Sequence, residues 1–119
     1  MKPVLALDIE LKNELMTTVR LTTGGVSSFA GLSYDDGEDC KVCVTESLLL
    51  LAHGGYESAH VAFYLDGGLS VAVEGENRTA SRSSEGDEIS VALLNALARD
   101  VVLEKKEGTT SKVCFRFAL

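Results

Sequence analysis

The sequence predicts an α+β domain, in which about three helices cover one face of a mostly antiparallel mixed sheet as a two-layer sandwich. Apolar residues recur at helical spacing in three segments and alternate in several others. The expected order of elements is strand, helix, helix, strand, strand, loop, helix, strand, strand. No linker or internal repeat divides the 119 residues, so residues 1–119 are expected to form one domain.

The first half of the chain is expected to hold one strand and two helices. Val4 to Glu10 has the aliphatic content of a strand, and apolar residues then recur at helical spacing from Leu11 to Phe29. Ser33 offers a capping hydroxyl just before a pair of acidic residues, which the positive end of a helix favours. A second helix is therefore expected from about Asp35 to His53.

The segments from His60 to Leu65 and from Leu69 to Val73 alternate and are separated by Asp66-Gly67-Gly68, a pattern that predicts a hairpin. Gly75 to Glu88 contains almost no apolar residues and is expected to be a loop. Apolar residues at helical spacing then predict a third helix from Ile89 to Val101.

Two further strands are expected to close the chain. The first runs from Val102 to Lys106 and ends at a turn formed by Glu107 and Gly108. The second passes through Val113, Phe115 and Phe117, which alternate with more polar residues.

Four consecutive leucines, Leu48 to Leu51, lie near the end of the second expected helix. At about 100° per residue they sweep most of the way round a helix, so no single buried stripe holds all four. We therefore expect at least one of them to lie outside the main core-facing stripe.

Composition excludes several classes of function. The formal net charge of -7 argues against a nucleic-acid-binding surface, which would need clustered basic residues. No apolar run approaches the ~20 residues that span a bilayer. Met1-Lys2-Pro3-Val4 begins an alternating pattern without a signal-peptide cleavage site, and 3 cysteines are an odd number for a disulfide framework. A cytoplasmic protein with reduced thiols, without a nucleic-acid or membrane partner, is expected.

Cys40 and Cys43 have the CxxC spacing of a zinc knuckle or a redox pair. The remaining candidate ligands, Cys114, His53 and His60, include no second closely spaced pair. Both cysteines fall on the apolar face of the expected helix, where a free cysteine behaves as a small hydrophobe. We interpret them as buried structural thiols and expect no metal site.

Several segments together suggest a family. Arg20-Leu21-Thr22, SYDDGEDCKVCVTES (residues 33–47), LSVAVEG (69–75) and LLNALARDVVLEKKEGTT (93–110) resemble the bacterial anti-sigma-factor serine kinases, members of the histidine-kinase-like ATPase superfamily. The likeness covers nearly the whole chain in the order of its elements and is most specific from Ser33 to Ser47.

The resemblance implies a nucleotide site whose motifs have degenerated. The family's second helix carries a catalytic glutamate and, one turn later, an asparagine that binds Mg²⁺; here Glu46 matches the glutamate and Leu50 replaces the asparagine. In the family's Asp-x-Gly motif for adenine, Val73 replaces the aspartate and Gly75 is a vestige. Where the family cradles phosphates, Gly86 is followed by two carboxylates.

These departures predict a regulatory domain of the anti-sigma-factor type that works through protein–protein interaction, without a nucleotide or other cofactor. The implied partner is a sigma factor or an anti-sigma antagonist, with Arg20 at the contact, and a homodimer is expected. Leu49 and Leu50 are expected either to fill the vacated cavity or to form a partner-binding patch. The alternative is an active serine/threonine kinase that binds ATP with Mg²⁺ through divergent contacts, with Glu46 as the base.

Overall fold

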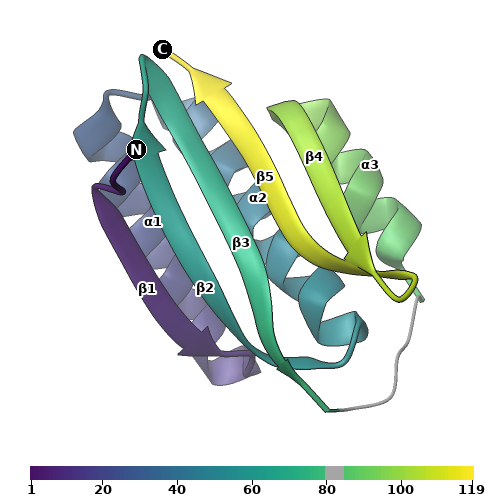
Figure 1. Cartoon of the computed structure of the whole chain (residues 1–119). Helices are drawn as coiled ribbons and strands as arrows, with labels where there is room; N and C mark the ends of the chain where they lie inside the picture. The colour runs from purple at the N-terminus through teal and green to yellow at the C-terminus, as the bar shows by residue number, and fades with distance from the viewer. Residues whose placement is uncertain (80–84) are drawn as a thin grey trace.

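The computed structural model describes residues 1–79 and 85–119 and forms a two-layer α+β sandwich (Figure 1). The expected order of elements is confirmed, with a short 3-10 helix η1 before the first α-helix. The bounds are β1 Leu5–Glu10, η1 Asn13–Leu15, α1 Met16–Ala30, α2 Tyr34–His53, β2 Tyr56–Leu65, β3 Gly68–Arg78, α3 Asp87–Leu97, β4 Arg99–Lys106 and β5 Thr109–Ala118.

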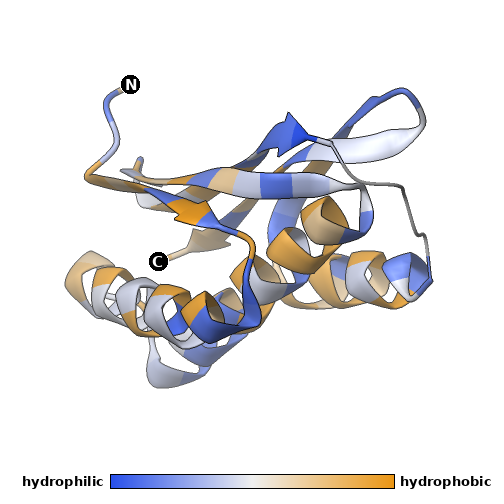
Figure 2. Cartoon of the chain, turned by 90° about the horizontal axis from the view of Figure 1, so that it is seen from below, coloured by the Kyte–Doolittle hydropathy of each residue, from blue (hydrophilic) through white to orange (hydrophobic). Residues whose placement is uncertain are grey.

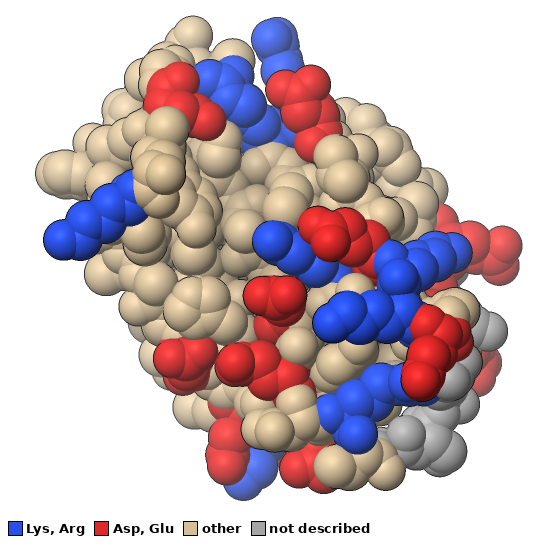
Figure 3. All heavy atoms as spheres, in the orientation of Figure 1, with Lys and Arg blue, Asp and Glu red and all other residues tan. Residues whose placement is uncertain are grey.

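The five strands form one open sheet in the order β1-β2-β3-β5-β4, with β1 and β4 at its edges. Every neighbouring pair in the described part of the chain is antiparallel, so the expected mixed character is not found there. All three helices lie on one face of the sheet (Figures 1 and 2). The other face is open, and Figure 3 shows both basic and acidic side chains on it. The predicted two-layer sandwich is thus confirmed.

The core lies between the sheet and α2, the central helix of the second layer. Alternate residues of β2, β3 and β5 point towards the helices, and those at the centre, such as Phe63, Val73 and Val113, are fully buried. Ser33 caps α2 as expected, because its hydroxyl accepts a hydrogen bond from the backbone N–H of Asp36 at 3.1 Å.

The prediction of a loop from Gly75 to Glu88 is wrong at both of its boundaries. β3 continues to Arg78, which lies opposite Tyr56 on β2, and α3 begins at Asp87. Polar side chains do not prevent this pairing, since the backbone makes the ladder, and Nε of Arg78 donates a hydrogen bond to the carbonyl of Gly54 at 2.8 Å. Residues 80–84 of that predicted loop lie outside the described residues.

The third helix is shorter than the sequence predicts. It ends at Leu97, because Ala98 adopts an extended backbone with φ -110° and ψ 169°. β4 then begins at Arg99, opposite Arg116 of β5, and Val101 belongs to that strand. Within the described part of the chain, no helix has both the length and the apolar character needed to span a bilayer.

Candidate functional site

Helix α2 presents three side chains to α3, spaced by about one turn. The hydroxyl of Ser90 on α3 donates a hydrogen bond to Oε1 of Glu46 at 2.8 Å. One turn further along α2, Leu50 is only 1% exposed, and beyond it Nδ1 of His53 lies 2.8 Å from Oδ1 of Asp87. The first turns of α3 therefore pack against the face of α2 that carries Glu46 and Leu50, and these two polar contacts hold them there.

The leucine run is divided between the two sides of α2 as its spacing requires. Leu48 and Leu51 face the sheet and are fully buried, and Leu50 is buried as well. Leu49 is half-buried. Leu50 thus contributes to the core and not to an exposed patch of the monomer, while the partner-binding interpretation of Leu49 stays a prediction.

The end of the Asp-x-Gly-like segment on β3 is also occupied by the protein's own side chains. Val73 faces the helices and is fully buried. A Cβ atom added to Gly75 would lie 2.6 Å from Cγ of Tyr56, so the tyrosine ring packs directly over this glycine. Packing of Tyr56 therefore explains the glycine without a nucleotide.

These residues do not fit ATP with Mg²⁺. Leu50 offers no oxygen ligand to a metal ion, and Val73 offers no acceptor for an adenine amino group. Asp87 and Glu88 place carboxylates in the first turn of α3, where a phosphate would otherwise be favoured. Glu46 already accepts the Ser90 hydrogen bond, and we derive no catalytic step from it.

A groove of about 520 Å³ runs between α3 and the β4–β5 hairpin. Leu50, Val91 and Leu103 supply its apolar lining, and Asp87 and Glu88 lie along it. The groove thus combines an apolar lining with two acidic residues and one basic residue, Lys105.

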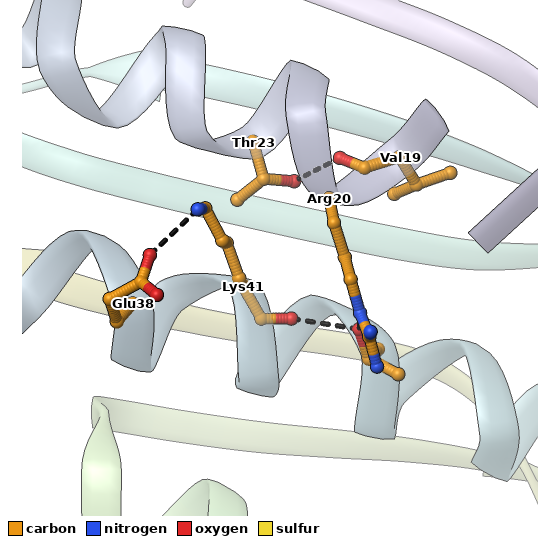
Figure 4. Close-up of polar contacts among 6 residues, drawn as sticks. Val19, Arg20, Thr23, Glu38 and Lys41 are labelled. Carbon is orange, nitrogen blue, oxygen red and sulfur yellow. Dashed lines mark hydrogen bonds and ion pairs between the residues drawn. The ribbon is translucent and has the colours of Figure 1, made fainter. Parts of the chain in front are cut away.

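A second hollow, here called the polar pocket, lies between α1 and α2 and has a volume of about 300 Å³. Nε of Arg20 donates a hydrogen bond to Oγ1 of Thr45 at 3.2 Å, and Nζ of Lys41 pairs with Oε2 of Glu38 at 2.6 Å (Figure 4). The residues lining the polar pocket are Arg20, Glu38, Lys41, Val42, Thr45 and Glu46.

Arg20 is held in place without being neutralised. The Thr45 hydroxyl that accepts its Nε–H donates in turn to the Lys41 carbonyl at 2.9 Å, which fixes the hydroxyl (Figure 4). Among the described residues, no carboxylate forms an ion pair with Arg20. Its terminal nitrogens can therefore bind an incoming anionic group, for which a guanidinium is well shaped.

Gly24 explains how Lys41 fits beside α1. A Cβ atom at Gly24 would lie 2.8 Å from Cε of Lys41, so the lysine stem passes directly over the glycine. α1 is continuous across Gly24 and Gly25, so the close approach of a neighbour, rather than a break in the helix, accounts for Gly24.

The structure brings together two residues that the sequence singled out separately, since Arg20 and Glu46 both line the polar pocket. Gly75 and Leu50 are not among its lining residues. Sequence reasoning missed Lys41 and Thr45, although their spacing of four residues on an expected helix places them on one face. It also missed Ser90, because no local pattern links residues 46 and 90.

No protein-family model matches this sequence, and no curated protein matches it at a significant level. The suggested relation to the anti-sigma-factor kinases therefore rests on the sequence motifs alone, and the structure establishes the fold class.

The two thiols on α2 are built into the core. Cys40 and Cys43 are fully buried and unbridged, and burial raises the pKa of each to about 12. A thiol with so high a pKa is almost entirely protonated at neutral pH and so a poor nucleophile or metal ligand. Within residues 1–79 and 85–119, no cluster of three or more histidine, cysteine or acidic side chains is suited to a metal ion.

Proposed function

We propose that this chain is a regulatory domain of the anti-sigma-factor type that acts by binding another protein and not by using a nucleotide. One observation carries this proposal: α3 is fastened to the α2 face that would line a nucleotide site, with Glu46 bonded to Ser90 and Leu50 buried. Opening that face would break the Ser90 hydrogen bond and expose apolar surface, both of which cost free energy.

The polar pocket is the proposed contact for the protein partner. Arg20 lies there with its terminal nitrogens available, so a carboxylate of a sigma factor or of an anti-sigma antagonist would complete the site. The unbridged cysteines agree with action in the reducing bacterial cytoplasm.

The nucleotide part of the proposal is tested by calorimetry and thermal shift with ATP and ADP, with and without Mg²⁺. A ligand present at 100 times its dissociation constant stabilises a protein by about 2.7 kcal/mol, a shift that is easily seen. We expect no heat of binding and no shift at millimolar nucleotide. A clear Mg²⁺-dependent shift would overturn the proposal in favour of the serine/threonine kinase, with Glu46 as the first residue to replace.

The partner contact is tested by titrating the sigma factors and candidate antagonists of the source organism individually against the chain. Arg20→Glu is expected to weaken the recognised partner at least about tenfold, because it reverses the charge at the contact, and Arg20→Lys to weaken it less. The matched control is Arg99→Glu, at an exposed arginine on β4. Equal loss with both variants would indicate a general charge effect and contradict a specific contact at Arg20.

A further inference from the structure

The groove between α3 and the β4–β5 hairpin is separate from the polar pocket, because the residues that line the two hollows are all different. It lies at the β4 edge of the sheet, where α3 packs beside β4 (Figure 1). Its volume of about 520 Å³ is typical of sites for small ligands, which are mostly apolar with a few well-placed polar groups. The groove therefore has the size and lining of a ligand site.

The apolar part of the groove comes from three elements. Leu50 of α2 is almost fully buried and forms its floor. Val91 of α3 and Leu103 of β4 are partly buried against the core and form its walls. An apolar ligand side chain would be removed from water on several sides here, which favours binding.

Three consecutive residues with hydroxyl groups begin β5, and the middle one is unsatisfied. The hydroxyl of Thr109 donates to the carbonyl of Lys106, and that of Ser111 donates to the carbonyl of Glu104, both at 3.1 Å. Thr110 lines the groove and is only 8% exposed, yet its hydroxyl has no hydrogen-bond partner among the described residues. Leaving a buried hydroxyl unpaired costs free energy, and a polar ligand atom in the groove would remove this cost.

Lys105 is the cross-strand neighbour of this threonine. It lies opposite Thr110 in the β4–β5 ladder, and side chains of opposite residues project from the same face. Both residues line the groove. An ammonium and a hydroxyl on one side can donate hydrogen bonds to the same carboxylate. The hairpin side of the groove is therefore suited to a ligand carboxylate.

The α3 side of the groove carries the opposite charge. Asp87 is already paired with His53, whereas Glu88 forms no ion pair with any described residue. Lys105 forms none within residues 1–79 and 85–119 either, so Glu88 and Lys105 line one groove without pairing with each other. Two opposite charges arranged in this way leave room between them for a ligand that carries both signs.

We propose that this groove binds a free α-amino acid with a large apolar side chain. Its carboxylate lies between Lys105 and Thr110, its ammonium faces Glu88, and its side chain packs against the apolar lining. A ligand with a single charge would leave one of the two protein charges unpaired, so charge complementarity selects the zwitterion. The regulatory domain thus carries a site for a small effector in addition to its protein contact.

The ligand class is tested by calorimetry with L-phenylalanine and L-leucine as probes. Phenethylamine lacks the carboxylate of phenylalanine, hydrocinnamate lacks its ammonium, and glycine lacks the side chain. We expect at least one of the two probes to bind, and each of the three analogues to bind at least about tenfold more weakly than phenylalanine or leucine. No heat with either probe at millimolar concentration, or an analogue that binds as tightly as the probes, would overturn the proposal.

The site is tested by removing one charge at a time. Glu88 and Lys105 are exposed, so Glu88→Gln and Lys105→Gln should fold, and each is expected to weaken binding of the probe about tenfold. Lys106→Gln is the matched control, because Lys106 is the next residue of β4, is exposed and does not line the groove. Unchanged binding by Lys105→Gln, or an equal loss with Lys106→Gln, would contradict the site.

Thr110→Val tests the unpaired hydroxyl. We expect weaker binding of the probe without a loss of stability in the unliganded protein, because the hydroxyl has no partner to lose among the described residues. A marked loss of unliganded stability with unchanged binding would show that the hydroxyl serves the fold and would overturn its role. Failure of these tests leaves the partner test at Arg20 unaffected, since Arg20 does not line the groove.

Discussion

Replacing Leu50 by asparagine restores the residue type that the resemblance places at this position, and it tests whether α3 closes the face of α2. Leu50 is 1% exposed and belongs to the core. Large-to-small replacements of such leucines cost about 2–5 kcal/mol, and an amide buried without partners costs about 1–3 kcal/mol. Because asparagine fills part of the leucine volume, we expect a loss of about 3–4 kcal/mol in the free energy of unfolding.

The assay is urea denaturation followed by circular dichroism. If the dependence of the unfolding free energy on urea concentration (the m-value) is unchanged, the substitution has altered stability alone. Two controls bracket the result. Leu50→Met keeps the volume and should cost less than about 1.5 kcal/mol. Leu49→Asn, at the half-buried neighbour, should cost clearly less than Leu50→Asn. A loss below about 1 kcal/mol for Leu50→Asn would refute the reasoning, because it would mean that the amide reaches water.

Three further predictions concern the contacts around this face and the core. Ser90→Ala, which removes the donor to the α2 carboxylate, should cost about 1–2 kcal/mol in urea denaturation, and equal stability would mean that the bond does not form in solution. Gly75→Ala should cost about 1–3 kcal/mol because its methyl group meets the Tyr56 ring, and most of that loss should vanish in a Tyr56→Ala background. The pKa values of Cys40 and Cys43 are raised from 9.0 to about 12, so the unfolded chain releases these protons first and stability should fall between pH 9 and 12. Denaturation at pH 8 and pH 10 measures this fall, which the double replacement by alanine should reduce.

Part of the candidate site could be predicted from the sequence. Arg20 and Glu46 were singled out by resemblance to a motif, and Lys41 and Thr45 follow from helical spacing once α2 is assigned. The bond between Glu46 and Ser90 could not be predicted, because 44 positions separate the two residues and no local pattern joins them. The burial of Leu50 depends in the same way on where α3 packs.

The sequence by itself determined the order of the elements and the faces they bury, because helical and alternating periodicities record locally which side chains leave water. It did not determine where β3 ends, since the backbone pairing that extends β3 to Arg78 depends on β2 and not on the polar side chains of that segment. Only the tertiary structure decided that α3 closes over Leu50 and that β1 is left as an uncovered edge. Both follow from contacts between segments far apart in the chain, which local spacing does not encode.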